Sequence, residues 1–382
     1  MKFSKLTLLN NLFWFSVLLF GSVLTFAQQS ATSSPALPSS PQQPAPVQPP
    51  GTQRSEPTPA LKVPQAAATQ GLDPKTGEPL YETIRENWSS LQVGDSDLTP
   101  EPPIASDVDD EGRFTRQLVV VKWRPGDPID LWIAMPKGVK NPPVVLYLYG
   151  YKEDTDRFRD NGWCERATAG GVAAVGFVSA LSGHRFHDRP MRQWFVSELQ
   201  ESLGSTVHDL KFILDYLNSR GDMDMAKVGM FGEGSGGAIA ILAAAADPRI
   251  KAIDLLEPWG DWPNFLSTSV VPLEDPEHDN YKKLEFVHKV ETLEPVKWLP
   301  TLKIPIRMQQ VQDDASVSME AKEALKNAAP KGTQVRRFET KLAMFNSERG
   351  GVLFDWVKDR LNEIGPKSSV AAQNSEGKPR VN

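Results

Sequence analysis

The sequence predicts an α/β protein with a mostly parallel central sheet, an antiparallel edge at the N-terminal side of that sheet, and helices on both faces. From about residue 114 to residue 365, short and almost purely apolar runs alternate with amphipathic stretches of helical length. Parallel strands that are buried on both faces need such apolar runs, and the helices between them make right-handed crossovers. Ligands are therefore expected at the carboxyl ends of the strands.

The antiparallel edge comes first in the chain. The runs "FTRQLVVVKW" and "IDLWIAMP" lie on either side of the turn "RPGDP", which is typical of two paired antiparallel strands. The next runs, "PPVVLYLYGY" and "GVAAVGFVSAL", are apolar enough to be buried on both faces. Further strands are predicted at "KVGMFG", "IKAIDLLEP", "IPIRMQQVQ" and "TQVRRFET".

Helices are predicted between these strands. The stretch "DRFRDNGWCERATAGG" has helical spacing and a glycine stop, and the apolar residues of "SLGSTVHDLKFILDYLNSRG" fall on one stripe. Other helices are predicted at "SGGAIAILAAAA", "SMEAKEALKNAAP" and "GGVLFDWVKDRLNEIG". Residues 263–300 are interpreted as a small helical cap.

The first 27 residues have the three-part pattern of a secretory signal. Two lysines precede an apolar run over residues 6–26, and Ala27 ends the segment at a small-residue cleavage site. An uncleaved membrane anchor is the alternative, because the run is nearly long enough to span a bilayer. The polar Asn10 and Asn11 shorten the run and favour cleavage. We therefore expect an exported protein, periplasmic or extracellular, with no stable membrane span after cleavage and a membrane anchor if the signal is kept.

Composition separates the folded part from its flanks. Residues 28–72 are rich in Pro, Gln, Ser and Ala without any period and are interpreted as a disordered linker, because they have too little apolar surface to offset the entropy of ordering. Residues 367–382 form a similar tail. The segment between them, residues 73–366, is long enough for one large domain.

Charge and cysteine content exclude several function classes. The formal net charge of −6 and the lack of a basic run exclude nucleic acid as an expected partner. Cys164 is the only cysteine, so no intramolecular disulfide can form, and we expect it to be a buried structural residue.

The glycines of "GEGSGG" do not have the spacing of a dinucleotide fingerprint, and we expect no cofactor.

These features resemble the α/β-hydrolase superfamily, in particular its secreted esterase, dienelactone-hydrolase and peptidase-like branch. The resemblance covers roughly residues 110–365. It rests on the order of the elements, on "VVLYLYGY" where the family carries a strand ending in His-Gly, on "VGMFGEGSGGAIA" as the nucleophile turn, and on "IPIRMQQVQDD" as the acid-bearing strand. The resemblance implies hydrolysis of an ester or peptide bond by a serine, a histidine and an acid.

The nucleophile turn of this chain departs from the family pattern G-x-S-x-G. When the strand and helix are aligned with that pattern, Glu233 precedes the nucleophile position and Gly234 occupies it. Ser235 falls one residue later, where the family uses mainly the backbone N–H. The alternative alignment makes Ser235 the nucleophile, whereas a structural interpretation places it at the N-cap or in the first turn of the helix, where its hydroxyl satisfies a free amide.

The base of the triad is absent from its expected place. The family carries this histidine before the last helix, but the chain has no histidine after His288 and reads "FETKLAMFNSERGG" there. The acid position is kept at Asp314, which is also suited to cap the following helix. Tyr149 and Gly150 stand where His-Gly is usual, and their amides could still stabilise an oxyanion.

Two loops carry further candidate chemistry. His184, His187 and Asp188 follow a central strand and could bind a metal, serve as a base for Ser235, or form a hydrogen-bonded loop; the spacing favours the loop, and no metal is expected. Glu257 and Trp259 follow the next strand and should line the pocket, either as a platform for a sugar or aromatic ligand or as packing.

Two hypotheses follow from the sequence. In the first, the protein has lost serine-hydrolase chemistry and binds a small-molecule or carbohydrate-like ligand, or a partner. In the second, it is an active esterase or peptidase with Ser235 as nucleophile, Asp314 as acid and His184 as an unusual base. Triad residues act as a unit, so two departures at once favour the first hypothesis.

Overall fold

The computed structural model of the 382-residue chain describes residues 85–94, 96–151, 155–181, 199–268 and 284–364. All of them belong to the compact unit Ala67–Asn382. The predicted signal segment, the linker and the C-terminal tail lie outside the described residues, as do His184, His187 and Asp188.

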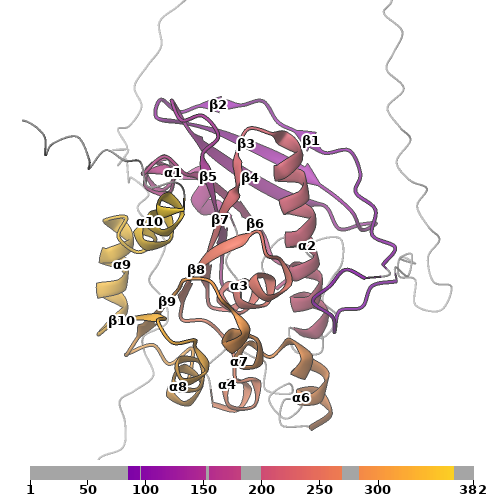
Figure 1. Cartoon of the computed structure of the whole chain (residues 1–382), viewed down its shortest axis with the longest axis vertical. Helices are drawn as coiled ribbons and strands as arrows, with labels where there is room; N and C mark the ends of the chain where they lie inside the picture. The colour runs from indigo at the N-terminus through magenta and orange to yellow at the C-terminus, as the bar shows by residue number, and fades with distance from the viewer. Residues whose placement is uncertain (1–84, 95, 152–154, 182–198, 269–283, 365–382) are drawn as a thin grey trace, which may run out of the picture. The chain divides into compact units, whose positions relative to one another are not determined.

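Within the described residues, ten strands form one sheet in the order β1-β3-β4-β6-β5-β7-β8-β9-β10, with β2 paired to β3 (Figure 1). The strands from β6 to β10 in this order are parallel, whereas β1 to β4 pair in antiparallel fashion and β4 joins β6 antiparallel. This confirms the predicted mostly parallel sheet with an antiparallel N-terminal edge. The strands are β1 (Ile104–Ala105), β2 (Asp109–Asp110), β3 (Phe114–Val121), β4 (Ile129–Pro136), β5 (Pro143–Leu148), β6 (Ala173–Phe177), β7 (Asp224–Glu233), β8 (Ile250–Leu256), β9 (Ile306–Val311) and β10 (Gln334–Phe338).

Helices cover both faces of the sheet, as expected for an α/β fold. Figure 1 shows α1 and α10 on one side and α2 and α3 on the other. The helices are η1 (Asp156–Arg159), α1 (Asn161–Thr168), α2 (Leu199–Arg220), α3 (Ser235–Ala246), α4 (Trp262–Thr268), α6 (Leu284–Val290), η3 (Glu291–Leu293), α7 (Pro295–Trp298), η4 (Leu299–Thr301), α8 (Met319–Ala328), α9 (Lys341–Arg349) and α10 (Asp355–Glu363). In the described part of the chain, no helix is both long and apolar enough to cross a membrane.

The central strands divide the core into two halves. Every residue of β5 is buried, and its side chains alternate between the two faces. Val144 and Leu146 join the core on the α2 and α3 side, whereas Val145 and Tyr147 join the core beneath α1 and α10. This double burial explains why the strand is an almost continuous apolar run in the sequence.

The helices between β8 and β9 occupy the region predicted as a cap. Trp262, Phe265 and Leu293 from this region belong to the same core as α2 and α3. The indole Nε1 of Trp262 donates to the carbonyl of Leu293 at 3.0 Å, which ties α4 to η3. These helices therefore extend the layer formed by α2 and α3 and share its core.

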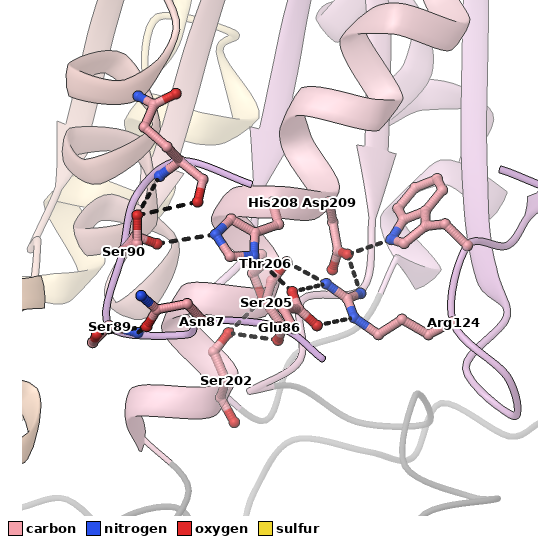
Figure 2. Close-up of polar contacts among 12 residues, drawn as sticks. Glu86, Asn87, Ser89, Ser90, Arg124, Ser202, Ser205, Thr206, His208 and Asp209 are labelled. Carbon is pink, nitrogen blue, oxygen red and sulfur yellow. Dashed lines mark hydrogen bonds and ion pairs between the residues drawn. The ribbon is translucent and has the colours of Figure 1, made fainter. Parts of the chain in front are cut away.

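A buried ionic cluster fastens the N-terminal segment, residues 85–94, to α2 (Figure 2). The carboxylate of Glu86 accepts from Arg124 at 2.7 and 2.5 Å and lies 2.6 Å from Nδ1 of His208. Arg124 also donates to Asp209, which accepts from the indole of Trp123 at 2.7 Å. Burial opposes ionisation of Glu86, but Arg124 and His208 outweigh it and lower its pKa to about 2.

The same segment packs against α2 through its backbone. A Cβ at Gly204 would lie 2.2 Å from the carbonyl oxygen of Trp88, so only glycine admits this close approach. Nε2 of His208 lies 2.9 Å from the carbonyl oxygen of Ser90. Both ring nitrogens of His208 are thus occupied within this cluster, and the ring is unavailable as a catalytic base.

Candidate active site

The turn between β7 and α3 is centred on Gly234. Its φ of 55° and ψ of −117° lie where residues with a side chain are strained. The amide of Gly234 donates to the carbonyl of Leu256 at 2.9 Å, and its own carbonyl accepts from Trp259 at 3.0 Å. The sharp change from strand to helix therefore occurs at Gly234, and Ser235 is the first residue of the helix.

Trp259 fills the space toward which a side chain at position 234 would point. A Cβ built on Gly234 would lie 3.3 Å from the indole Nε1 of Trp259. The indole is 7% exposed and contacts Phe265 and Tyr151, with ring centroids 4.8 and 6.1 Å away. Position 234 thus has neither a reactive group nor free space in front of it.

Ser235 is completely buried, with 0% exposure. Its Oγ makes no hydrogen bond with any residue that the structure describes. The cap position of α3 is Gly234, which has no side chain to accept from the helix amides. Ser235 is therefore a first-turn residue whose hydroxyl satisfies no amide there, contrary to the structural interpretation of the sequence.

An ionic group lies beside the turn. Arg157 of η1 is 3.4 Å from Glu233, the last residue of β7, and 3.3 Å from Glu348 of α9. Its guanidinium also lies 5.1 Å from the ring centre of Tyr149. Burial raises the pKa of Tyr149 well above its ordinary value, although the charge of Arg157 opposes this. A Cβ on Gly150 would be 3.3 Å from the carbonyl oxygen of Glu233, so Gly150 also lines the turn.

The acid position pairs with a lysine. Asp314 follows β9, and its Oδ1 is 3.0 Å from Nζ of Lys341, the first residue of α9. The same carboxylate accepts from the amide of Ser316 at 2.8 Å. Burial opposes ionisation, but Ser316 and Lys341 lower the pKa of Asp314. Asp314 does not cap the next helix, because Ser318 accepts the amide of Ala321 in that role.

Glu257 lies at the carboxyl end of β8 and is buried. Its Oε1 accepts from the amide of Val311 at 2.5 Å, and its Oε2 lies 2.8 Å from Nζ of Lys322. Its φ of 46° is unusual for a residue with a side chain. Burial raises its pKa to about 7, in spite of the opposing effect of Lys322. The carboxylate is thus held by the neighbouring strand and helix.

No family model and no curated protein matches the sequence. Solved structures do match the fold. The acetyl xylan esterase from Paenibacillus sp. R4 is 18% identical with a TM-score of 0.52, covering 65% of this chain and 89% of that one. Acetyl xylan esterase 1 from Thermoanaerobacterium sp. JW/SL YS485 is 13% identical with a TM-score of 0.50, covering 68% and 89%. An S-formylglutathione hydrolase from Agrobacterium tumefaciens is 15% identical with a TM-score of 0.50, covering 67% and 99%.

The chain has the α/β-hydrolase fold. This agrees with the fold expected from the order of strands and helices in the sequence. At these identities the likeness concerns the fold alone, because one fold carries many unrelated chemistries. What the α/β-hydrolase fold does in this chain has to be inferred from its own residues.

The described histidines of this α/β-hydrolase-fold protein do not reach Ser235 by any hydrogen bond. His208 is held in the cluster with Glu86, and His288 lies on α6 and lines a pocket together with Trp262 and Lys297. Among the described residues, no group of His, Cys, Asp and Glu could hold a metal ion. The loop with His184, His187 and Asp188 is outside the described part of the chain.

Sequence reasoning missed four residues that surround the turn and the acid position: Arg157, Lys322, Lys341 and Glu348. Lys341 could have been identified from the sequence, because it is the first basic residue after the last strand, close to where proteins of the α/β-hydrolase fold carry the catalytic histidine. Arg157, Lys322 and Glu348 look like ordinary surface charges in helical stretches. Only the tertiary structure brings them beside Glu233 and Glu257.

Proposed function

We propose that this chain is an exported α/β-hydrolase-fold protein that does not hydrolyse bonds through a serine triad and acts by binding a small-molecule or carbohydrate-like ligand, or a partner. The observation that supports this proposal best is the pairing of Gly234 with Trp259. A glycine stands at the sharp turn, and the indole occupies the direction in which a nucleophile would project. Trp259 thereby shields the place where substrate would have to approach.

The surrounding charges support the same proposal. Glu233 and Glu348 flank Arg157, and Asp314 is engaged by Lys341. A protonated lysine donates hydrogen bonds and has no free lone pair, so it does not act as a general base in that form. The carboxylate at the acid position therefore orients a cation rather than an imidazole.

The competing function is an active esterase or peptidase with Ser235 as nucleophile, Asp314 as acid and His184 as base. One observation favours it: the Oγ of Ser235 has no hydrogen-bond partner among the described residues. Its complete burial works against it, because a nucleophile must meet its substrate.

A covalent probe distinguishes the two functions. We expect the mature protein to remain unlabelled by a fluorophosphonate and to leave p-nitrophenyl acetate and butyrate unhydrolysed, while a known serine esterase reacts under the same conditions. Ser235→Ala is the matched variant. Stoichiometric labelling of the wild type that disappears in Ser235→Ala would overturn the proposal.

Export has its own test. Expression of the full chain with a C-terminal tag, followed by fractionation and intact-mass analysis, should give a soluble exported species that begins at Gln28. A full-length product retained in the membrane fraction would instead support the anchor.

A further inference from the structure

A pocket of about 630 Å³ opens where the N-terminal segment, residues 85–94, meets α3, η3, α7 and η4. It is lined by Ser89, Ser90, Leu91, Gln92, Ala245, Glu291, Thr292, Lys297, Trp298 and Thr301. Ala245 stands near the end of α3, whereas Gly234 precedes its first residue. With a rise of about 1.5 Å per residue, the helix separates the pocket from the turn by about 15 Å. The pocket is therefore a different place from the candidate active site.

Hydrogen bonds within the protein hold the walls of this pocket in place before any ligand binds. The side-chain Nε2 of Gln92 donates to the carbonyl of Ala246 at 3.3 Å, which joins the N-terminal segment to α3. The indole Nε1 of Trp298 donates to the carbonyl of Thr292 at 2.8 Å, and the hydroxyl of Thr301 donates to the carbonyl of Trp298 at 2.7 Å. The aromatic ring is thus held in one orientation, and a ligand would lose little entropy in ordering it.

The charges on the pocket wall cancel. Lys297 donates to Glu291 across the wall, and this hydrogen bond lowers the pKa of Glu291. A charged ligand would have to compete with this pair. A neutral ligand can use the remaining donors of the ammonium group and the second carboxylate oxygen, because one contact leaves both groups with further hydrogen-bonding capacity.

The remaining lining combines an aromatic ring with hydroxyl and amide groups. An indole offers a flat apolar face, and Ser90, Thr292 and Gln92 add polar groups around it. A purely apolar ligand would cover the ion pair of Glu291 and Lys297 and leave its remaining hydrogen-bonding capacity unused, which is costly. A sugar ring has both an apolar C–H face and hydroxyls at its edge, and a volume of this size accommodates a ligand of one to a few rings.

A second pocket continues past the same ion pair. It has a volume of about 360 Å³, and its lining includes Trp262, His288, Glu291 and Lys297. Glu291 and Lys297 line both pockets, so one ligand that crosses the pair would contact both. This arrangement favours a chain of sugar units over a single ring.

We propose that the pocket around Trp298 is a binding site for a neutral oligosaccharide, with the indole of Trp298 stacking on one ring and the Glu291–Lys297 pair hydrogen-bonding to hydroxyls. The site lies away from Gly234, so it does not depend on the absence of serine chemistry. Labelling of Ser235 by a fluorophosphonate would leave this inference untouched.

Calorimetric titration of the mature protein tests the site. The probes are cellobiose, cellotetraose, maltose and N,N′-diacetylchitobiose, with octanoate as an apolar, charged comparison. We expect at least one sugar to bind in the millimolar range or tighter, the tetrasaccharide more tightly than its disaccharide, and octanoate not to bind. Absence of binding by all four sugars at millimolar concentration overturns the proposal.

Variants locate the binding. Trp298→Ala should weaken binding of the sugar by about tenfold or more, because it removes the aromatic face on which a sugar ring stacks. Trp132→Ala is the matched control, since this tryptophan is also partly buried but belongs to β4 and packs on the other core. Equal weakening by both, or no effect of Trp298→Ala, places the sugar elsewhere and overturns the proposal.

Two milder variants keep the test valid if Trp298→Ala lowers the melting temperature. Trp298→Phe keeps an aromatic face and removes only the Nε1 donor, so binding should persist with a small loss. Lys297→Met changes a side chain that is 54% exposed, so we expect the variant to fold normally. It should weaken binding of the sugar severalfold. Unchanged affinity in Lys297→Met together with full loss in Trp298→Phe would contradict the proposed geometry.

Discussion

Nζ of Lys341 lies 3.0 Å from Oδ1 of Asp314, and this contact joins the segment after β10 to the segment after β9. A second lysine–acid pair, Lys322 with Glu257, lies nearby at 2.8 Å. The two pairs differ in burial: the side chain of Lys341 is 48% exposed, and that of Lys322 is 4% exposed.

This difference predicts unequal costs of removing the lysine. Lys341→Met should lower the free energy of unfolding by less than about 1 kcal/mol, because solvent screens the half-exposed pair. Lys322→Met should lower the free energy of unfolding by about 3–5 kcal/mol, since it removes the ion-pair partner of the buried Glu257 and the donor to the carbonyls of Val311 and Asp314. Urea unfolding of both variants at neutral pH measures the contrast. Equal losses in the free energy of unfolding would show that burial does not determine how much each lysine–acid pair stabilises the fold.

The packing of Trp259 on the turn predicts an energetic coupling with position 234. Gly234→Ala should lower the free energy of unfolding by about 1–3 kcal/mol. The backbone at position 234 is strained for any residue with a Cβ, and the new Cβ would lie 3.3 Å from the indole of Trp259. Trp259→Ala alone should cost about 3–5 kcal/mol. In the double variant the cost of Gly234→Ala should fall by about 1 kcal/mol, because the contact is gone.

A double-mutant cycle by urea unfolding checks this coupling. Gly138→Ala is a useful control, because Gly138 also has a positive φ of 77° but an added Cβ there meets nothing within 4 Å. It should show no coupling with Trp259→Ala. Strict additivity for Gly234 as well would show that the indole does not restrict the turn.

The raised pKa of Glu257 predicts a loss of stability as the pH rises. Burial raises its pKa from 4.5 to about 7, so the folded state binds this proton more tightly than the unfolded state. Its contribution to stability is therefore complete below about pH 4.5 and disappears as the pH rises through 7. Asp254, with a pKa raised to about 6 chiefly by burial, acts in the same direction.

Urea midpoints between pH 5 and pH 8 test this dependence. The wild type should lose stability on the order of 2 kcal/mol across the range. Glu257→Gln should flatten the profile, since it removes the titrating group, whatever its effect on absolute stability. A profile with the same slope in the variant would rule out Glu257 as the source.

Glu86 is predicted to anchor the N-terminal segment. Glu86→Gln leaves Arg124 and His208 with one buried carboxylate fewer and should destabilise the domain by about 3–5 kcal/mol. Arg85→Ala is the matched control, because its pair with Asp97 is exposed and should cost less than about 1 kcal/mol. Limited proteolysis should release the segment before the domain unfolds in Glu86→Gln only.

Much of the fold could be predicted from local patterns. Apolar runs such as "VVLYLY" are visible in sequence because β5 is buried on both faces, and α3 begins and ends where its small-residue stretch does. Helix α9 escaped prediction because Met344 is its only buried residue, which leaves no apolar stripe. Strands β1 and β2 have two residues each, too few for any period.

The sequence by itself determined the order of strands and helices, a glycine at position 234 before the serine, and the absence of a histidine after His288. Tertiary structure decided what surrounds these positions. Trp259 lies 25 residues beyond Gly234, just after the next strand of the sheet, and Lys341 lies 27 residues beyond Asp314, so no local pattern relates either pair. Local propensity depends on neighbours along the chain, whereas a site depends on side chains that parallel strands bring to one edge.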